Sequence, residues 1–533
     1  MDLNSLLIGI SSFAGGFGET SVSHEWIVNI IRWIVNFAGD VGLGIILFTL
    51  ALKLITLPLD ILSRASMRKN SLKMEMMKPE LEKLQKQYAN NQQLYQQKMM
   101  ALYKKNGYSA FSACLPTIIT LVFFFIVLGG FNSYSRYSEK QVFNEMGGAY
   151  AAAIEAYEGS VLVKADENQY NIDLNKVLSE SEYKDLFDGW SEEVNTDEKI
   201  YSLKDPTSLP SEFIGKYSLE KYFSDGGYDY SNSELTEGIT GKVWAKLISM
   251  LSEETRAALS ADGVISGDDK IEDLGKFYAA APDEVKAYFS LDENGAVSIN
   301  YGKIINEDAD IKSEFDANAK RAVSETAIKN IAGNKKEEIQ NVARKAAEKE
   351  YENSRAHSAI VPWVKNLWVV DSPFSSAIKD YEGFKKSVGD DNVGTLTENA
   401  YAEITYYLES EKQTGFGSGN GLFILVAISI LSMLGSTFVS NKTQQAQTQL
   451  STVDGANGTA ASTQKMMMWM MPIMFGIFAF IYSAAFSLYM ITSTLLSTGS
   501  TLAINFFVEK AFNNKIKKEA AEKAEKKKYG KLR

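Results

Sequence analysis

The stretch VGLGIILFTLALKLITLPL, residues 41–59, decides the fold of this chain. It carries no charge except Lys53, and as a helix it can cross the roughly 30 Å hydrocarbon core of a bilayer. A charged side chain inside such a span costs about 2.5 to 3.5 kcal/mol, so Lys53 should face protein or trapped water. Thr49 and Thr56 share its helical face. This stripe predicts a polar site inside the membrane.

Further apolar stretches predict four more spans. The charge-free run from 466 to 508 has 43 residues, about 64 Å as helix and twice what one bilayer core needs. It should therefore fold back, with a tight turn near residues 482–487. The five predicted spans are 41–59, 110–131, 421–440, 466–485 and 488–508.

Charge patterning predicts which side of the membrane each loop occupies. Residues 134–415 hold 31 Lys and Arg against 53 Asp and Glu, a net charge of -22, whereas the whole chain carries -11. The rest of the chain is therefore basic, mainly in 60–109 and 509–533. The positive-inside rule places both of these segments in the cytoplasm. We expect a multi-pass protein of the cell membrane, N-terminus outside and C-terminus inside, with the acidic block outside.

The residues before the first span divide into two segments. Residues 1–23 form an N-terminal segment, in which the weakly apolar run 6–17 leaves a cleaved signal open as an alternative. Residues 24–38 have apolar positions at helical spacing with two Trp, which predicts an amphipathic helix in the outer interface. The alternative is an extension of span one, but Gly39 and Asp40 favour a break. The single cysteine, Cys114, excludes an intramolecular disulfide.

Residues 60–109 predict a cytoplasmic hairpin of two helices joined near Lys78, with Pro79 in the first turn of the second. Its methionines predict either an adaptable partner surface or a simple hairpin core. Residues 441–465 predict a cytoplasmic linker. The basic tail 509–533 predicts contact with anionic lipids or with ribosomal RNA, the alternative being a solvated face. The residues expected to make that contact are Lys515, Lys517, Lys518, Lys526, Lys527 and Lys528.

The hydroxyl groups of the spans gather in their predicted cytoplasmic halves, whereas the outer halves are apolar, except that span four has Ser483 and Ser487 near its outer end. This distribution predicts a hydrophilic groove open to the cytoplasm and sealed outside. Taken singly, each hydroxyl could instead bond its own helix backbone or pack between helices, and Lys53 could reach the headgroups. The predicted groove residues are Lys53, Thr49, Thr56, Ser112, Thr117, Thr120, Ser429, Ser432, Ser436, Thr494, Thr498, Thr501 and Asn505.

Several blocks carry a resemblance to a known family. They are HEWIVNIIRWIVNFAGDVGLGIILFTLALKLITLPL from residue 24, KMEMMKPELEKLQKQY from 73, MMALYKKNGYSAFSACLP from 99 and QKMMMWMMPIMFGIFAFIYSAAFSLYMITSTLLS from 464. In this order, the chain resembles the YidC/Oxa/Alb family of membrane protein insertases, in its bacterial form. The resemblance covers nearly all of residues 24–133 and 421–510.

The resemblance implies a function. In that family a positive residue of the first core span, usually Arg, lies in a groove and attracts the hydrophilic segment of a nascent membrane protein. The matching position, five residues before Pro58, is Lys53, which keeps the charge but loses the planar fork of Arg. The implied partners are nascent membrane proteins, the Sec translocon, the ribosome through the basic tail and cytoplasmic loops, and anionic lipids. No DNA partner is expected.

The large departure from the family is an acidic extracytoplasmic insert, 134–357, followed by a juxtamembrane return segment, 358–420. A helical stretch is expected at 335–355, and the insert is expected to be an α+β fold. We find no metal, phosphate or nucleophile motif in it and assign it no function. The predicted fold class is an all-α polytopic membrane protein with a five-helix core, a cytoplasmic helical hairpin and this soluble insert.

The leading hypothesis is therefore an insertase and chaperone that is not an enzyme and needs no cofactor or metal. One alternative is a polytopic transporter or channel, which predicts polar residues through the whole depth or inverted repeats. The other is an envelope enzyme acting through the insert, which requires clustered catalytic residues. Neither feature is present in the sequence.

Overall fold

The computed structural model describes residues 8–9, 25–107, 111–166, 169–191, 200–354, 357–389, 393–394, 396–443, 470 and 473–529. Side chains at some of these positions, including 111–121, 505 and 511–529, are not described. The chain divides into two compact units. The insert unit comprises 1–11 and 153–342, and the bundle unit comprises 12–152 and 343–533.

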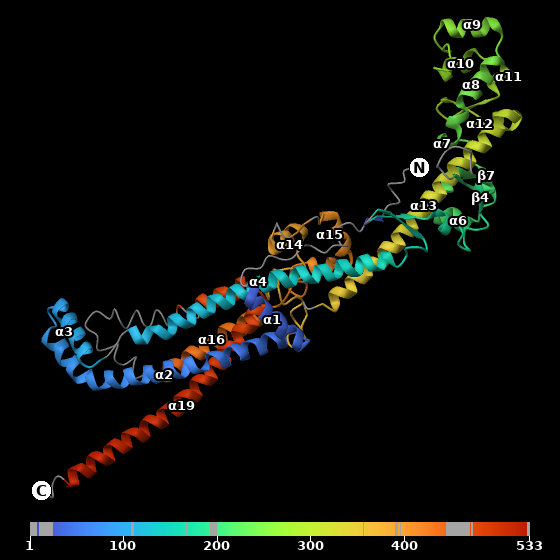
Figure 1. Cartoon of the computed structure of the whole chain (residues 1–533). Helices are drawn as coiled ribbons and strands as arrows, with labels where there is room; N and C mark the ends of the chain where they lie inside the picture. Colours follow the sequence, from blue (N-terminus) through green and yellow to red (C-terminus); the bar gives the residue numbers. More distant parts are fainter. Residues whose placement is uncertain are drawn as a thin grey trace. The chain divides into compact units, whose positions relative to one another are not determined.

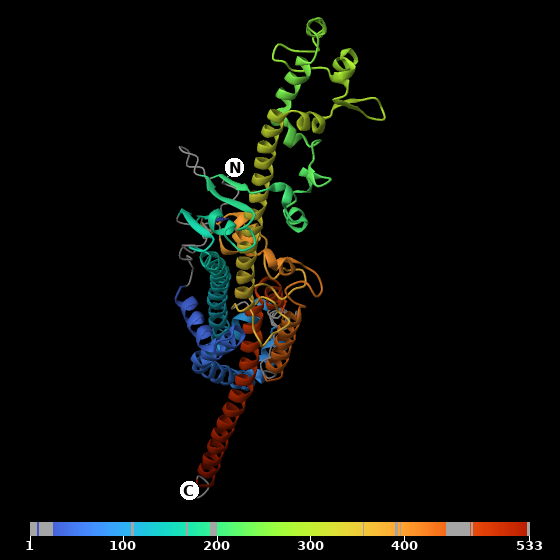
Figure 2. The ribbon, with the colours of Figure 1, turned by 90° about the vertical axis from the view of Figure 1, so that its right-hand side faces the viewer.

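Long helices form most of the bundle unit. They are α1 (Glu25–Ala38), α2 (Val41–Gln87), α3 (Gln92–Lys105), α4 (Phe111–Glu155), α16 (Ile424–Thr443) and α19 (Ala484–Tyr529). Helix α19 packs against α2 and α16, while α1 packs against α2; Figure 2 shows these helices side by side. Shorter helices, α14 (Tyr381–Val388), α15 (Glu398–Ile404) and η6 (Tyr406–Lys412), lie in the return segment.

Helix α1 is amphipathic, and the predicted break after it is confirmed. Its apolar side is buried, whereas Trp26 and Trp33 are 59% and 70% exposed. Gly39 then turns the chain with a φ of +71°, a region that glycine enters without strain. Asp40 caps α2 by accepting a hydrogen bond from the Leu43 N–H at 2.9 Å. An exposed aromatic row opposite a buried apolar face suits a helix at a lipid interface.

The hairpin has its turn at a different place from the one predicted. Helix α2 continues through Pro58 and Pro79 to Gln87, so the prediction that a second helix starts at Pro79 is wrong. The chain turns at 88–91, and α3 folds back beside the end of α2 (Figure 1). A small core holds this hairpin together, made by Met77, Leu81, Leu84, Met99, Leu102 and Tyr103.

The predicted turn between spans four and five is confirmed. Residues 473–481 are helical, the helix is interrupted at Tyr482 and Ser483, and α19 begins at Ala484. Among the described residues, one helix segment, Val41–Leu62, is long and apolar enough to cross a membrane, and Ile424–Val439 is apolar but shorter. The five-span arrangement therefore stays a prediction.

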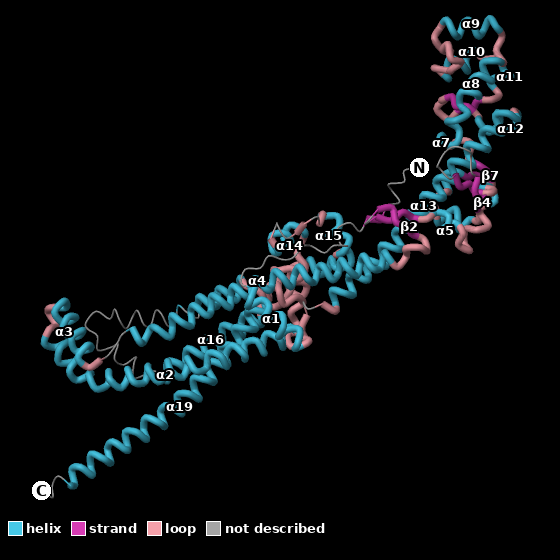
Figure 3. Tube along the Cα trace, in the orientation of Figure 1, coloured by secondary structure: helices cyan, strands magenta, loops and turns pink. Residues whose placement is uncertain are grey.

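Within the insert unit, all the sheets are small and antiparallel, and Figure 3 shows strands only there. One three-stranded sheet has the order β1-β3-β2, with Ile8 opposite Tyr170, and three hairpins pair β4 with β5, β6 with β7 and β8 with β9. The strands are β1 (Ile8–Gly9), β2 (Leu162–Asp166), β3 (Gln169–Ile172), β4 (Phe187–Ser191), β5 (Ile200–Leu203), β6 (Phe223–Ser224), β7 (Gly227–Tyr228), β8 (Phe289–Leu291) and β9 (Val297–Ile299).

Helix α13 (Ala309–Glu352) contains most of the predicted helical stretch and extends much further towards the N-terminus. Phe315, Ala319, Val323 and Ala327 recur every four residues and are fully buried. Ser324 accepts a hydrogen bond from the Leu203 N–H at 3.0 Å, which joins α13 to β5 within the insert unit. The other helices are α5 (Leu174–Leu178), η2 (Pro206–Ser208), α6 (Ser211–Lys216), η3 (Glu220–Tyr222), α7 (Ser233–Thr236), η4 (Glu237–Ile239), α8 (Thr240–Ser249), α9 (Glu253–Ala261), α10 (Leu274–Ala280), α11 (Asp283–Lys286) and α12 (Tyr301–Glu307).

Candidate functional site: a half-buried lysine and a hydrogen-bonded collar

The amine of Lys53 lies between two helices of the bundle. Its Nζ donates to Asp60 Oδ2 at 2.5 Å and to Ser497 Oγ at 3.0 Å. Asp60 lies two turns further along α2, and Ser497 belongs to α19. Only 15% of the Lys53 side chain is exposed, against 35% of the Asp60 side chain. The cation is thus paired with groups of the protein, as its cost in an apolar environment requires.

The two threonines predicted to flank Lys53 bond their own helix. Thr49 is buried and donates to the Ile45 carbonyl at 2.7 Å, while Thr56 is half-buried and donates to the Lys53 carbonyl at 3.2 Å. Hydroxyls in helices often make such backbone bonds. A hydroxyl oxygen keeps acceptor capacity after donating its proton, so both groups can still accept a hydrogen bond.

The predicted serines of α16 have different surroundings. Ser429 is buried and donates to the Ser487 carbonyl of α19 at 3.2 Å, so it joins two helices. Ser432 donates to the carbonyl of Ser429 at 2.8 Å within its own helix. Ser436 is half-buried. Ser429 therefore holds α16 to α19, a packing role that the sequence left open as an alternative.

Helix α19 presents a row of hydroxyls that includes one residue missed by sequence reasoning. Thr498 and Thr501 donate to the carbonyls of Thr494 and Ser497. Ser497 itself contacts Lys53, although it was not among the predicted groove residues. The available signal was helical spacing, because Ser497 follows Thr494 by three residues and precedes Thr501 by four, on the same face.

The remaining predicted groove residues have undescribed side chains. They are Ser112, Thr117 and Thr120 of α4 and Asn505 of α19, whose backbones are helical. The basic residues of the tail also lie on α19, with side chains outside the described set: Lys515, Lys517, Lys518, Lys526, Lys527 and Lys528. The linker 441–465 lies outside the described residues from 444 onward.

Large apolar side chains are exposed on every long helix of the bundle. On α2, Leu54, Ile55 and Leu62 are 62%, 70% and 68% exposed. Similar residues on the other helices are Val122, Phe125, Leu431, Phe438, Ile477, Ile481, Leu495 and Phe506. So much exposed apolar surface is far beyond what soluble monomers tolerate, and it is typical of a lipid-facing surface.

The opposite end of the bundle is held by the return segment, 358–420, which we call the collar. It begins at the corner between α1 and α2, where Asp40 accepts hydrogen bonds from Ser358 Oγ at 2.7 Å and the Ala359 N–H at 2.9 Å. Burial opposes ionisation of Asp40, but hydrogen bonds from Leu43, Ser358 and Ala359 outweigh it and hold its pKa below the ordinary value. An ionised Asp40 therefore joins the collar to α2.

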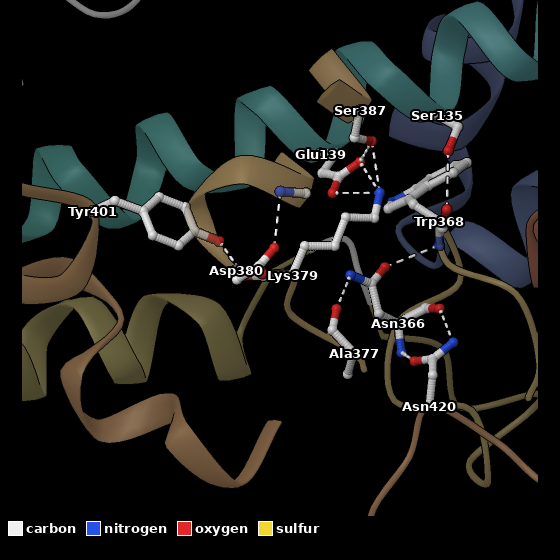
Figure 4. Close-up of polar contacts among 11 residues, drawn as sticks. Ser135, Glu139, Asn366, Trp368, Ala377, Lys379, Asp380, Ser387, Tyr401 and Asn420 are labelled. Atoms are coloured by element: carbon white, nitrogen blue, oxygen red, sulfur yellow. Dashed lines mark hydrogen bonds and ion pairs between the residues drawn. The ribbon is translucent and has the colours of Figure 1, made fainter. Parts of the chain in front are cut away.

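The collar is also bonded to α4, as Figure 4 shows. Ser135 of α4 donates to the Trp368 carbonyl at 3.1 Å. Glu139 of α4 pairs with the Lys379 amine at 2.9 Å and accepts a hydrogen bond from Ser387 Oγ. A carboxylate paired with both an amine and a hydroxyl is well satisfied. These bonds join α4 to the first half of the collar.

Within the collar, two buried asparagines fold the chain into a fixed loop (Figure 4). Asn420 Oδ1 accepts from the Asn366 N–H at 2.7 Å, and Asn420 Nδ2 donates to the Asn366 carbonyl at 2.9 Å. Asn366 Nδ2 in turn donates to the Ala377 carbonyl at 2.9 Å. The loop has little regular structure, so these amides satisfy backbone groups that would otherwise be buried unpaired.

The collar caps two more helices at their N-termini. Asp371, fully buried, accepts from the N–H groups of Leu422 at 2.9 Å and Leu425 at 2.6 Å, at the start of α16. The carbonyls of Val369 and Leu367 accept from the N–H groups of Ala484 at 2.8 Å and Ala485 at 2.9 Å, at the start of α19. The collar thus provides hydrogen-bond acceptors for N–H groups at the start of both helices, which have no partner within their own helix.

An aromatic layer lies directly below the collar. The Phe131 ring of α4 contacts Phe48 of α2 at a centroid distance of 5.6 Å and Tyr489 of α19 at 5.2 Å. The ring of Phe124, seven residues before Phe131 in α4, contacts Phe475 at a centroid distance of 4.6 Å and Phe486 at 6.0 Å. These rings pack against one another between α2, α4 and α19.

Comparison with known proteins identifies the family of the chain. The family model of the 60Kd inner membrane protein matches residues 33–154 and 354–511, just over half of the chain. The chain belongs to this family. The resemblance to the YidC/Oxa/Alb insertases is thereby confirmed, and membership makes the chain a protein of the cell membrane. The matched residues include α2, α4, α16 and the collar, whereas 155–353, most of the predicted insert, fall outside the match.

Curated members of the family match shorter stretches. The protein named membrane protein insertase YidC of Fusobacterium nucleatum is 34% identical over 105 residues, 20% of this chain and 49% of that protein. The protein of the same name from Francisella tularensis subsp. novicida is 39% identical over 108 residues, 20% of this chain and 19% of that protein. The protein of the same name from Chlorobaculum tepidum is 30% identical over 131 residues, 25% of this chain and 22% of that protein.

The chain therefore spans about half the length of the first of these relatives, and less than a quarter of the other two. No solved structure matches it significantly. The family is thus established by sequence, and the contacts at Lys53 and in the collar come from this chain alone.

Proposed function

We propose that this protein inserts nascent membrane proteins into the bilayer and helps them fold, without covalent chemistry. The observation that carries the proposal is the unequal character of the two ends of the bundle. The collar end is capped and filled with aromatic rings, whereas a cation and a set of hydroxyls occupy the other end. The names of the curated relatives, which are insertases, support the same activity.

The proposed topology follows from charge and from the helices. Five spans bring the N-terminus outside and the C-terminus into the cytoplasm, with the insert outside. In this topology the collar end of the bundle faces outward, because α16 and α19 both start there. The end that contains Lys53 then faces the cytoplasm, together with the hairpin of α2 and α3.

The proposed mechanism uses a hydrophilic groove between the helices. A polar segment of the client enters from the cytoplasm and finds hydroxyls and the Lys53 amine instead of hydrocarbon, which lowers its desolvation cost. The aromatic layer and the collar prevent an open water path, so ions do not leak. The apolar segment of the client then partitions sideways into lipid, driven by the hydrophobic effect. The groove would be lined by the residues predicted from the sequence together with Ser497.

The proposed partners follow from the basic segments. The lysines at the end of α19 would contact ribosomal RNA or the anionic leaflet, and the hairpin would meet the emerging client. The protein would act alone or with the Sec translocon. Nascent membrane proteins are its substrates in this proposal, and no nucleotide or metal takes part.

The proposal is tested in cells depleted of their own insertase. Lys53→Ala should slow insertion of a single-span client with a polar outer segment several-fold, and Lys53→Glu should slow it further because it repels acidic segments. Lys53→Arg is the matched control and should retain activity. Unchanged insertion by Lys53→Glu contradicts the role of the charge, and steady ion conductance by the purified protein in planar bilayers would favour the channel alternative.

The role of the tail is tested separately by ribosome co-sedimentation. Deletion of residues 509–533 should reduce the fraction of the protein that sediments with ribosomes, and the loss should be smaller at high salt, where the phosphate contacts of the intact tail are already screened. A matched variant in which only Lys526, Lys527 and Lys528 become Gln should lose part of the binding. Undiminished co-sedimentation of the deletion variant would remove the tail from the mechanism.

A further inference from the structure

Asp60 is the acidic residue nearest to Lys53 in the sequence, and no acidic residue lies between Asp40 and Asp60. It follows Lys53 by seven residues, two turns of helix, so the two side chains lie on one face of α2. The Nζ to Oδ2 distance of 2.5 Å makes this a close ion pair. The groove cation is therefore neutralised by a residue of its own helix.

We infer that Asp60 is a resident counter-ion, which an acidic segment of the client must displace to bind Lys53. The inference rests on the proposed function and deepens it by naming the residue that controls access to the cation. When Asp60 is paired with Lys53, a carboxylate of the client approaches a pair with no net charge, and Asp60 repels it. Without Asp60, Lys53 would attract any anion near it.

The exposures of the two partners favour this exchange. The Lys53 side chain is 15% exposed, so its amine depends on protein partners for its hydrogen bonds. The Asp60 side chain is 35% exposed, so its carboxylate can turn to water when the amine is taken by another anion. Ser497 keeps a hydrogen bond to the amine in both states, which holds Lys53 in position.

The exchange also gives a physical reason for release. A client segment held by an unopposed buried cation would leave slowly, because its departure would strand the charge. When the client leaves, the Asp60 carboxylate pairs again with the Lys53 amine, so the amine is not left without a counter-ion. The pair therefore makes binding reversible and selective for segments that carry enough acidic groups to compete with an attached carboxylate, whose effective concentration is high.

The test uses the full chain and two ribosome-bound single-span clients that differ at two positions of the outer segment, Asp in one and Asn in the other. A photoreactive residue beside these positions reports contact by crosslinking. Asp60→Asn should raise the ratio of acidic to neutral client crosslinked about tenfold, equivalent to about 1.4 kcal/mol. Asp60→Glu, which keeps the carboxylate, should stay near the wild-type ratio.

The remaining variants separate the possible failures. Lys53→Ala, alone or with Asp60→Asn, should bring the ratio to one. If Asp60→Asn leaves the ratio within twofold of wild type while Lys53→Ala lowers it, the counter-ion role is wrong and the insertase proposal stands. If the wild-type protein crosslinks neither client, the insertase proposal itself fails and the counter-ion role fails with it.

Stability gives an independent readout. Asp60→Asn leaves the half-buried Lys53 amine without a counter-ion, so it should melt at a lower temperature than the double variant that also carries Lys53→Ala. If Asp60→Asn does not accumulate, its rescue by Lys53→Ala supports the same coupling, and failure of that rescue overturns it. Equal melting temperatures for wild type, Asp60→Asn and the double variant would also overturn it.

Discussion

The two ends of the bundle unit are stabilised by different interactions. At the collar end, one irregular segment bonds the corner of α1 and α2, the side of α4 and the first amides of α16 and α19. At the Lys53 end, several described hydroxyls bond their own helix, and the described side-chain bond from Lys53 to Ser497 crosses from α2 to α19. The first arrangement bonds helices to each other, and in the proposed mechanism the second would let α2 and α19 separate.

This difference teaches how a membrane protein can be open on one side. Bonds between helices must be broken when the helices part, whereas bonds within a helix survive. Hydroxyls that bond their own backbone can therefore line a polar path at little cost when α2 and α19 move apart. The collar would keep the other end closed during that movement. The predictions below test this contrast.

The largest effect is expected at Asp371. Asp371→Ala removes the acceptor of two amides at the start of α16 in a fully buried place. Each buried donor left unpaired costs about 1 to 3 kcal/mol, so for two donors we expect a loss of about 2 to 6 kcal/mol. The apparent Tm of the full chain in detergent should fall by several degrees. Asp371→Asn keeps one acceptor, so its Tm should fall by about half as much. An unchanged Tm in both variants would contradict the capping role.

The next effect compares two glycines. A Cβ on Gly44 would lie 2.7 Å from Val35 Cα, a backbone atom of α1 that cannot move without shifting the helix, whereas a Cβ on Gly499 of α19 meets no atom within 4 Å. Gly44→Ala should therefore destabilise the protein by about 1 to 3 kcal/mol by overpacking. Gly499→Ala should be neutral or stabilise by up to about 1 kcal/mol.

Thermal unfolding of both variants side by side measures this contrast. Equal shifts would show that packing at the collar end is no tighter than at the Lys53 end. A gain in stability for Gly44→Ala would contradict the close approach of α1 and α2 directly.

Local patterns predicted part of this architecture from the sequence. The aromatic and apolar spacing of 24–38, followed by Gly39 and Asp40, predicted the helix α1 and the break after it. The length of the charge-free run predicted the turn at Tyr482 and Ser483. Both rest on short-range rules of helix periodicity and length, which act within a few residues.

Other features depend on contacts that no local rule contains. Pro58 and Pro79 favour helix ends locally, but the packing of α2 along α1, α19 and α3 outweighs the loss at each proline. The collar joins residues more than 200 positions apart, such as Glu139 and Lys379, in a segment without periodicity. The Asp60 pair was missed because the apolar run was read only to its last uncharged residue, Leu59.

A smaller effect is expected at Ser497. Ser497→Ala removes one of two hydrogen bonds to the Lys53 amine, while the Asp60 bond remains. The loss of stability should be about 0.5 to 1 kcal/mol. Ser500→Ala is the matched control, because Ser500 donates to the Leu496 carbonyl within its own helix at 2.7 Å. Chemical unfolding of both variants measures the difference, and an equal loss would indicate that the bond to Lys53 adds nothing.

The smallest effect concerns pH and Asp40. Its pKa is lower in the folded protein than its ordinary value of 3.8, because its hydrogen bonds outweigh the penalty of burial. Folding therefore favours the ionised form, so the stabilisation is present above pH 3.8 and is lost as pH falls through the lower folded pKa. The Tm of wild type should exceed that of Asp40→Asn at pH 7, and the gap should narrow below pH 4. A gap that stays constant or widens on acidification would mean that an ionised Asp40 does not hold the collar to α2. The collar would then be held by Asp371, by the bonds to α4 and by the carbonyls that accept from the first amides of α19.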